Sequence, residues 1–190
     1  MSRLVLVRHA EPVADSRGRC YGRLDVELSE QGRRQADALA VTLRDEPIDL
    51  VVSSPRVRAV QTAAALGRTF EVDDRLSELD FGDFEGRTYE QLERDEPELF
   101  RRWMSSPTTV RFPNGESYAD LRRRATAALA DARSRAESAV VVTHGGVIRA
   151  GLAAWLELPD HAIFRLDQRY CGVTVVEWIG DEPVVRVLNG

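Results

Sequence analysis

The chain has 190 residues, of which 43% are hydrophobic and 30% are charged, and its net charge is −5 at pH 7. This length suits one globular domain that buries its core without disulfides or metal. The negative charge and the dispersed arginines exclude a protein that binds nucleic acid non-specifically. The N-terminus has neither a signal-peptide nor a transmembrane pattern, so we expect a cytoplasmic protein with no membrane partner.

Apolar runs that alternate with helical patterns predict the order of the secondary structure. We expect strands, in chain order, over 3–8, 48–53, 139–144, 172–179 and 184–188. Helical spacing predicts helices over 29–45, 54–67, 116–136 and 146–156. Three of these helices begin with a capping signal: Ser29, Ser54 followed by Pro55, and Ser117 three residues before Asp120. The alternation predicts an α/β fold with right-handed crossovers and a mostly parallel central sheet covered by helices on both faces.

Residues 78–115 interrupt this alternation. The stretch is rich in acidic and aromatic residues and contains three prolines. We predict an excursion that folds over the carboxyl edge of the sheet as a cap. The alternative is a surface loop with a short helix over 88–103. Because repeats and linkers are absent from the sequence, we expect a single domain over 1–190.

Two of the three histidines lie where predicted strands end: His9 directly follows the first strand, and His144 is the last residue of the strand over 139–144. Ligands of open α/β sheets bind at the carboxyl ends of adjacent strands, so two imidazoles there indicate a histidine nucleophile or a pair of metal ligands. Taken singly, a histidine at the end of a strand is more often a structural residue than a catalyst. The sequence has no H-E-x-x-H or C-x-x-C pattern, and Cys20 and Cys171 show no metal or disulfide spacing, which favours the nucleophile.

Cations and glycines surround these histidines in the sequence. Arg8 stands beside the first of them, and Arg56 and Arg58 lie in the first turns of the helix predicted after the second strand. Gly145 and Gly146 permit a close backbone approach at another helix start. Such a setting is typical of a phosphate site, where cationic arginines and a protonated second histidine would stabilise the phosphoryl oxygens.

A phosphate ester also needs an acid for its leaving group. Four carboxylates are crowded beside aromatic rings and are candidates for it: Glu78, Asp80, Asp83 and Glu85. Their spacing alone does not choose among them.

Five motifs follow one another in register between residues 3 and 150. They are Arg8-His9-Ala10-Glu11, Ser53-Ser54-Pro55-x-x-Arg58-Ala59-x-Gln61-Thr62-Ala63, Leu76-x-Glu78-x-x-Phe81-Gly82-x-x-Glu85-Gly86, Phe112-Pro113-x-Gly115-Glu116-Ser117 and Thr143-His144-Gly145-Gly146-x-Ile148-Arg149. Together they resemble the histidine phosphatase superfamily, also called phosphoglycerate-mutase-like. The resemblance implies a three-layer α/β sandwich with a small cap over the carboxyl edge of the sheet.

The resemblance also implies roles for single residues. His9 matches the phosphorylated nucleophile, and Glu78 matches the proton donor. The pocket that holds the phosphoryl group matches Arg8, Arg58 and His144, with a backbone N–H of Gly145. Arg56 stands where the family has an apolar residue, so no role is carried to it. Neither a metal nor an organic cofactor is implied.

One position departs from the family pattern. Asp15 stands where many members have an asparagine that touches phosphate, and a carboxylate there would repel the phosphate. The following loop, 19–29, is similar to that of α-ribazole phosphatases, a branch of the family in cobalamin biosynthesis. We hypothesise that Arg23, next to Gly22 in the substrate-binding loop, supplies the missing contact.

These observations favour a metal-independent phosphatase that hydrolyses a small-molecule phosphomonoester, with α-ribazole 5′-phosphate as the first candidate substrate. The alternatives are a phosphoryl transferase of the phosphoglycerate mutase type and a weakly active regulatory protein that binds phospho-ligands. A regulatory protein is expected to lose the nucleophile or the acid, and this chain keeps both. The sequence leaves open whether the protein is a monomer or a homodimer.

Overall fold

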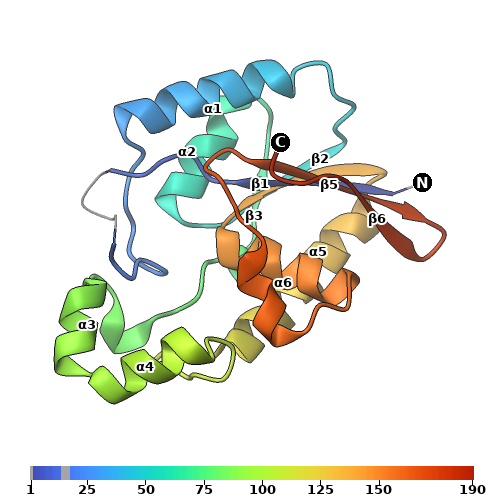
Figure 1. Cartoon of the computed structure of the whole chain (residues 1–190). Coiled ribbons are helices and arrows are strands. Elements are labelled where there is room, and N and C mark those ends of the chain that lie inside the picture. Colours follow the sequence, from blue (N-terminus) through green and yellow to red (C-terminus); the bar gives the residue numbers. More distant parts are fainter. Residues whose placement is uncertain (1, 14–17) are drawn as a thin grey trace.

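The computed structural model describes residues 2–13 and 18–190, so the hypothesis about Asp15 falls outside the described residues. Within these residues, six strands form one sheet in the order β3-β2-β4-β1-β5-β6 (Figure 1). Their bounds are β1 (Arg3–Arg8), β2 (Leu50–Ser53), β3 (Glu71–Val72), β4 (Ser138–Thr143), β5 (Val173–Ile179) and β6 (Glu182–Val187). The three strands predicted from continuous apolar runs therefore lie side by side in the centre of the sheet.

The central strands are parallel and the edge formed by β5 and β6 is antiparallel. β4 lies between β1 and β2 and runs parallel to both, and β3 continues the parallel part. β5 runs antiparallel to β1, and β6 antiparallel to β5. This arrangement confirms the prediction of a mostly parallel sheet. In the register of β1 and β4, Arg8 lies opposite Thr143. His9 and His144, which follow these two residues, thus leave the sheet next to each other.

Helices cover both faces of the sheet, which confirms the predicted α/β fold with helices on both faces (Figure 1). α1 (Glu30–Thr42) and α2 (Val57–Ala65) lie on one face, and α5 (Tyr118–Arg135) and α6 (Gly145–Trp155) on the other. Successive side chains of a strand point to opposite faces. The buried runs of β1 and β4 can therefore supply apolar side chains to both helical layers at once.

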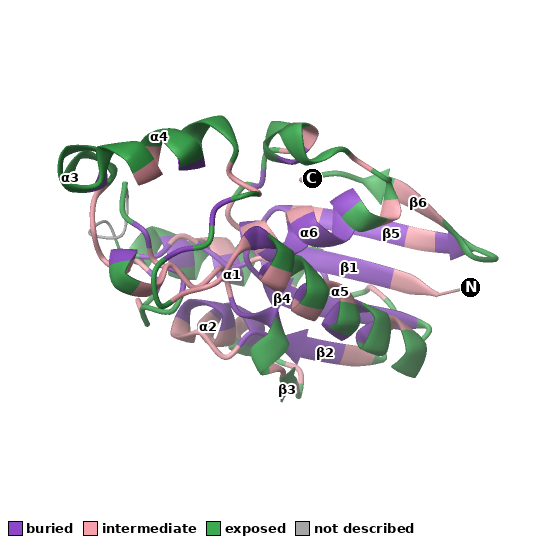
Figure 2. Ribbon diagram, turned by 90° about the horizontal axis from the view of Figure 1, so that it is seen from below, coloured by how far each residue is buried: buried purple, intermediate pink, exposed green. Residues whose placement is uncertain are grey.

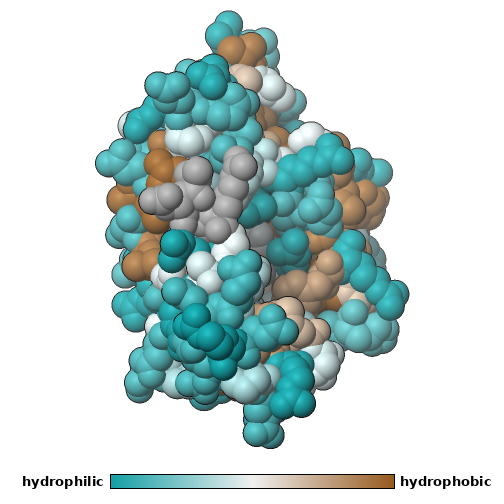
Figure 3. All heavy atoms as spheres, turned by 60° about the vertical axis from the view of Figure 1, so that its left-hand side comes forward, coloured by the Kyte–Doolittle hydropathy of each residue, from teal (hydrophilic) through white to brown (hydrophobic). Residues whose placement is uncertain are grey.

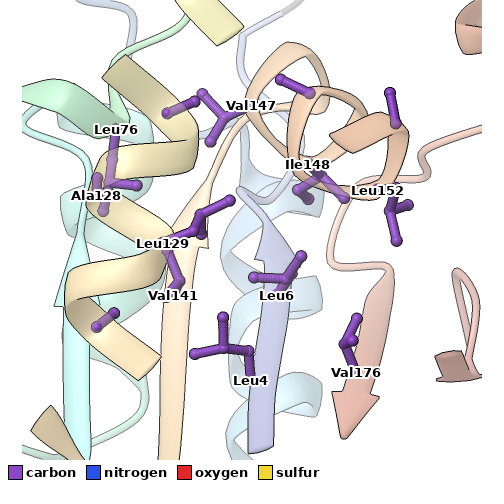
Figure 4. Packing of buried hydrophobic residues seen from close by; sticks show 14 of the residues in the cluster. Leu4, Leu6, Leu76, Ala128, Leu129, Val141, Val147, Ile148, Leu152 and Val176 are labelled. Carbon is purple, nitrogen blue, oxygen red and sulfur yellow. The ribbon is translucent and has the colours of Figure 1, made fainter. Parts of the chain in front are cut away.

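The largest hydrophobic core of the described residues lies between the sheet and the pair α5 and α6. In Figure 4, Leu4 and Leu6 of β1 and Val141 of β4 face side chains of these two helices, among them Leu129 and Ile148. All five side chains have no measurable exposed surface. Burial of this apolar surface is the main source of stability for such a fold, at about 25 cal/mol per Å², and it fixes the strands that end in the histidines.

Two of the three predicted helix caps are present. The Ser29 side chain accepts a hydrogen bond from the Gly32 N–H at the start of α1, and Ser117 forms a capping box with Asp120 at the start of α5. The prediction for Ser54 was wrong, because α2 begins at Val57 after an N-terminal cap residue, Arg56, that makes no side-chain cap bond. The Ser54 hydroxyl instead bonds a buried histidine, as described below.

Residues 78–115 form an arm outside the three layers. It contains the short helices α3 (Tyr89–Asp95) and α4 (Pro97–Ser105), which Figure 2 shows as a mostly exposed extension away from the strands. The helical stretch is broken because Pro97 starts a new helix. The arm has its own small core of edge-to-face aromatic rings, in which Trp103 contacts Phe81 and Phe112 at centroid distances of 5.7 and 5.2 Å.

The described residues also contain three 3-10 turns: η2 (Asp74–Leu76), η3 (Gly82–Phe84) and η4 (Asp160–Arg165). The face that carries the arm and the loops is largely hydrophilic, with separate hydrophobic patches toward its margins (Figure 3). None of the helices in residues 2–13 and 18–190 combines the length and the apolar character needed to span a bilayer.

Candidate active site

A cavity of about 250 Å³ opens at the carboxyl end of the parallel strands. This volume is several times the roughly 30 Å³ that one water molecule occupies in the liquid, so a small organic molecule fits. The residues that line it come from the strand ends, the helix starts and the arm: Arg8, His9, Arg19, Tyr21, Arg58, Glu78, Leu79, Phe81, Tyr89, Trp103, Pro107, Tyr118, Leu121, His144, Gly146, Arg149 and Phe164. Five of the eight site residues expected from the sequence are among them.

The two histidines lie together on the floor of this cavity. Their ring centroids are 5.1 Å apart, and the rings are inclined at 61°. His9 is 2% exposed and His144 is fully buried. The parallel pairing of β1 and β4 accounts for this proximity, because each histidine is the first residue beyond its strand.

His9 is held as one tautomer. Its Nδ1 lies 2.7 Å from the carbonyl oxygen of Ala10, and since a carbonyl only accepts, Nδ1 carries the proton. The lone pair of the ring is therefore on Nε2. Burial, together with the positive charges of Arg58 and Arg8, holds the pKa of His9 well below its ordinary value. The ring is thus neutral at neutral pH, as a nucleophile must be.

His144 is held through the other ring nitrogen, Nε2. Its Nε2 lies 2.7 Å from the hydroxyl of Ser54, whereas its Nδ1 is buried and has no partner among the described residues. Burial and the nearby charges of Arg58 and Arg8 also hold the pKa of His144 well below its ordinary value. We had expected this histidine to be protonated; the structure instead favours a neutral ring. With the Ser54 hydroxyl donating to Nε2, Nδ1–H is free to donate to an oxygen in the cavity.

Arg58 is a fully buried cation. Its Nη1 donates to the carbonyl of Leu24, and its Nη2 donates to the carbonyls of Tyr21 and Gly22, at 2.8 to 3.1 Å. No carboxylate pairs with it among the described residues. Burial is the largest influence on its pKa, which is lowered, yet a guanidinium stays protonated in proteins. Neutral carbonyl groups thus hold the guanidinium in position, and an anion bound in the cavity would be the first group of opposite charge to pair with it.

Arg8 is positioned by the other end of the chain. Its Nη1 donates to the carbonyl of Gln168 at 2.5 Å, and its guanidinium lies over the Tyr170 ring, 4.1 Å from the centroid. The Tyr170 hydroxyl in turn lies 3.1 Å from that of Tyr21. Nε of Arg8 is buried, and no hydrogen-bond partner for it lies in the part of the chain that the structure describes. Because buried donors are costly to leave unpaired, this atom and Nδ1 of His144 indicate where an anionic oxygen binds.

The structure separates the four candidate carboxylates. Only Glu78 lines the cavity, where its oxygens accept the N–H groups of Leu79 and Gly146 at 2.9 and 3.0 Å. The remaining three are engaged elsewhere: Asp80 with Arg23 and the Gly82 N–H, Asp83 with Asn114, and Glu85 with four backbone N–H groups.

The Glu85 carboxylate has a structural role. It accepts the N–H groups of Gly22, Arg23, Leu24 and Phe81. Two of these residues, Gly22 and Leu24, place their carbonyls on the guanidinium of Arg58. Gly22 thus acts through its backbone, and a Cβ there would lie only 1.6 Å from the carbonyl oxygen of Leu79.

The loop that carries Glu78 is clamped by Arg124 of α5, which the sequence did not single out. Arg124 donates to the carbonyls of Ser77 and Glu78 at 2.6 and 2.9 Å, and its guanidinium pairs with Glu116 at 2.7 Å. Glu116 also accepts the N–H of Asp80. Glu116, which stands in the fourth of the five motifs, thus contacts the backbone of the loop that carries Glu78.

Two further predicted residues lie outside the cavity lining. The side chain of Arg23 is 63% exposed and pairs with Asp80 at 3.0 Å, so the hypothesis that it touches phosphate gains no support. Gly145 is the first residue of α6, and a Cβ on it would approach Nη1 of Arg149 to 3.0 Å. The N–H of the next glycine, Gly146, bonds Glu78, and a role for the Gly145 N–H stays a prediction.

Several residues of the site had no clear sequence signal. Ser54 stood in a recognised motif but had been assigned to a helix cap. Tyr21 and Tyr170 lie at positions that no local pattern connects, and Arg149 stood in the fifth motif without an assigned role. In residues 2–13 and 18–190, no group of three or more His, Cys, Asp or Glu side chains is placed to hold a metal ion.

Known proteins resemble this chain along most of its length. It is 40% identical over 162 residues to phosphoserine phosphatase 1 of Hydrogenobacter thermophilus, a match that covers 82% of this chain and 77% of that protein. A mycobacterial glucosyl-3-phosphoglycerate phosphatase, solved with VO3, is 33% identical with a TM-score of 0.89, and each chain is covered completely.

The α-ribazole phosphatase of Shigella flexneri also has a TM-score of 0.89, at 26% identity, with 99% of this chain and 96% of that one covered. The family model of the histidine phosphatase superfamily (branch 1) matches residues 4–190. Fold, motif order and site geometry agree with this match, and the chain belongs to the histidine phosphatase superfamily.

Proposed function

We propose that this protein hydrolyses small-molecule phosphomonoesters through a phosphohistidine formed on His9, without a metal or cofactor. The observation that carries the proposal is the fixed tautomer of His9, whose Nδ1–H is engaged by the Ala10 carbonyl so that Nε2 keeps the lone pair. That ring lies in a cavity with two arginines and a second histidine. Membership of the histidine phosphatase superfamily and the phosphatase names of its relatives support the same reaction.

In the first step, Nε2 of His9 attacks phosphorus and the bond from phosphorus to the ester oxygen breaks. That oxygen takes the proton of the Glu78 carboxyl group and leaves as the alcohol. Arg8, Arg58 and Nδ1–H of His144 bind the phosphoryl oxygens, on which negative charge is spread in the transition state. Each of these donors is already held in place before the substrate binds, so little reorganisation is needed.

In the second step, water attacks phosphorus and the bond from phosphorus to Nε2 breaks. The Glu78 carboxylate takes a proton from the water, which restores the acid for the next cycle. Inorganic phosphate leaves and His9 returns to its neutral form. The overall reaction consumes one ester and one water, and yields one alcohol and one phosphate.

We propose that side chains of the arm determine which phosphate esters bind. Phe81, Tyr89, Trp103 and Pro107 line the outer part of the cavity, where the alcohol part of an ester would lie. α-Ribazole 5′-phosphate is the candidate from the loop resemblance, and the neighbour from Shigella flexneri agrees with it. A role in cobalamin biosynthesis, a cytoplasmic location and a monomeric or homodimeric state stay predictions.

Phosphate release from an aryl phosphate, α-ribazole 5′-phosphate and phosphoserine tests the proposal, with and without a chelator. We expect turnover that resists the chelator, and a phosphoryl adduct on the intact protein that disappears in His9→Ala. Loss of activity with the chelator would point to a metal hydrolase. Transfer of the phosphoryl group back to an alcohol rather than to water would identify a mutase. Binding of the esters without turnover would indicate a regulatory protein.

A further inference from the structure

Two tyrosines connect the arginines that we assign to the phosphoryl group, and the proposed reaction does not use them. The guanidinium of Arg8 lies over the ring of Tyr170, 4.1 Å from its centroid, and that of Arg58 lies over the ring of Tyr21, at 5.0 Å. The two tyrosine hydroxyls are 3.1 Å apart and share a hydrogen bond. The four side chains thus form a continuous chain of contacts from one arginine to the other.

Arg8 and Arg58 carry like charges and line the same cavity. Like charges repel each other, and the repulsion is stronger where burial lowers the local dielectric constant. The face of an aromatic ring carries negative partial charge and attracts a cation above it. Each guanidinium is therefore drawn onto a ring of its own, and the hydrogen bond between the hydroxyls fixes how far apart the two rings lie.

The loop that carries Tyr170 is bonded to the strand end that carries the nucleophile. The N–H of Cys171 donates to the carbonyl of Arg8 at 3.0 Å, and the N–H of Arg8 donates to the carbonyl of Gly172 at 3.3 Å. Cys171 has a φ of 53°, in the left-handed region that a residue other than glycine adopts at a cost. The Tyr170 ring also lies 5.6 Å from the His9 ring. Backbone and ring contacts thus hold Tyr170 against both Arg8 and His9.

Tyr21 is joined to Arg58 by two different contacts. Besides the contact with its ring, its carbonyl accepts a hydrogen bond from Nη2 of Arg58 at 3.1 Å. The residue is half-buried and lines the cavity. Burial raises the pKa of its hydroxyl, so this phenol stays protonated at neutral pH and able to form the hydrogen bond. The positions of the Tyr21 ring and of the Arg58 guanidinium therefore depend on each other.

We propose that Tyr21 and Tyr170 are positioning residues, whose hydrogen-bonded pair sets the spacing between Arg8 and Arg58. This inference rests on the proposed function, in which both arginines bind phosphoryl oxygens while Nε2 of His9 attacks. Attack requires phosphorus to lie at a fixed place relative to that nitrogen. Since the two guanidinium groups determine where the oxygens lie, their spacing determines where phosphorus lies. The tyrosine hydroxyls themselves neither form a bond nor transfer a proton in the reaction.

A double-mutant cycle on the two hydroxyls tests the inference. Tyr21→Phe and Tyr170→Phe each remove one hydroxyl and keep the ring that contacts the arginine. We expect each to lower kcat/KM for an aryl phosphate by about 3- to 10-fold, as for the loss of one hydrogen bond. Because the two hydroxyls act through their shared bond, the double variant should lose no more than one single variant does.

The same cycle on oxyanion binding reports on the arginines without turnover. Calorimetry measures the affinity for inorganic phosphate and for orthovanadate, which can bind five ligands as phosphorus does in the transition state. We expect the two single variants and the double variant to weaken vanadate binding by the same factor, about 3- to 10-fold. Phosphate binding should weaken less, because the spacing of the arginines is set for the transition state. A merely structural role would weaken both affinities equally.

Tyr170→Leu removes the ring as well as the hydroxyl. We expect kcat/KM to fall by a further factor of about 3 to 30 relative to Tyr170→Phe, because leucine offers the Arg8 cation no aromatic face. Tyr118→Phe combined with Tyr170→Phe is the matched control. The Tyr118 hydroxyl is buried and has no partner among the described residues, so the factors of these two variants should multiply.

The outcomes separate the two proposals. If the wild type does not hydrolyse the aryl phosphate, the proposed function fails, and the cycle on vanadate binding still decides on the tyrosine pair. Losses that multiply in Tyr21→Phe with Tyr170→Phe, or single variants with wild-type kcat/KM and vanadate affinity, would refute the pair. A loss in Tyr21→Phe alone would also overturn it, because that hydroxyl would then act on the substrate directly. A wild type that neither hydrolyses the ester nor binds vanadate would refute both proposals.

Discussion

The floor and the rim of the cavity are held by different kinds of interaction. On the floor, His9, Arg8 and Arg58 are fixed by main-chain carbonyls, and all but Arg8 are almost fully buried. On the rim, Tyr89 and Phe164 are about half exposed, at 45% and 51%, and they are held by ring contacts. Main-chain hydrogen bonds fix an atom to tenths of an ångström, whereas exposed side chains can be replaced at low cost. The floor is therefore suited to chemistry and the rim to selection.

The largest effect is expected on the floor. His9→Ala removes the nucleophile, and we expect kcat to fall by about 10⁴-fold or more for every ester, as for other enzymes that lose a nucleophile. Steady-state phosphate release measures this. His161→Ala is the matched control, because His161 is exposed in η4 and outside the cavity. Equal activity of His9→Ala and the wild type would refute the nucleophile assignment.

Glu78→Gln tests the proposed proton donor, which we place between the floor and the rim of the cavity. We expect a loss of about 10²- to 10⁴-fold in kcat for alkyl phosphates, and a much smaller loss for an aryl phosphate, because an aryl oxygen leaves without a proton. Asp83→Asn is the control, since Asp83 bonds Asn114 and does not line the cavity. The same loss for both classes of ester would show that Glu78 is not the acid.

Gly146→Ala probes how tightly the acid is held. A Cβ on Gly146 would lie 2.1 Å from Oε1 of Glu78, so the carboxylate must shift. We expect kcat for alkyl phosphates to fall by roughly tenfold, as one power of ten follows from about 1.4 kcal/mol in the barrier. The effect should disappear when Gly146→Ala is made in Glu78→Gln. An undiminished effect in that background would mean that the helix start acts on phosphorus.

The pH dependence of stability tests the neutral histidines of the floor. Their pKa values lie well below 6.5 in the folded chain and near 6.5 in the unfolded chain. Between those values the unfolded chain binds more protons. The two histidines thus make their full contribution to the free energy of unfolding above about pH 6.5. This contribution falls as the pH drops below that value, by at most about 1.4 kcal/mol per pH unit for each histidine.

Denaturant unfolding between pH 5 and pH 8 measures this dependence. In His9→Gln, which removes one of the two groups, the slope below pH 6.5 should be smaller. The kcat/KM of the wild type should likewise hold its plateau down through pH 6.5, because His9 stays neutral there. A half-maximal rate at pH 6.5 or above would contradict the lowered pKa of the nucleophile.

The smallest effect is expected for Arg23. Its side chain is largely exposed and its ion pair with Asp80 lies outside the cavity. Because exposed pairs contribute little, Arg23→Ala should change kcat/KM by no more than about 5-fold for any ester in the panel. A loss of more than tenfold would restore the hypothesis that Arg23 binds the phosphate.

Local patterns in the sequence were enough to predict most of the sheet, the helices on its two faces and the chemistry. Apolar period and length placed five of the six described strands to within two residues, as for β1 and β4, because burial on both faces leaves a continuous apolar run. The two-residue strand β3 was not predicted, because both of its residues are exposed and form no such run. The order of the motifs indicated the family, and with it His9, His144 and Glu78. The caps at Ser29 and Ser117 were correct because a capping bond involves only residues three apart.

The tertiary structure decided which atoms those residues contact. Ser54 and His144 are 90 positions apart, and their hydrogen bond overrides the local helix-cap signal because a buried imidazole needs a partner. Glu85 bonds the loop at Gly22, 63 positions away, whereas Glu78 lines the cavity. Such contacts join residues that are far apart along the chain, so no short sequence pattern specifies them. Only the folded chain reveals which residues meet.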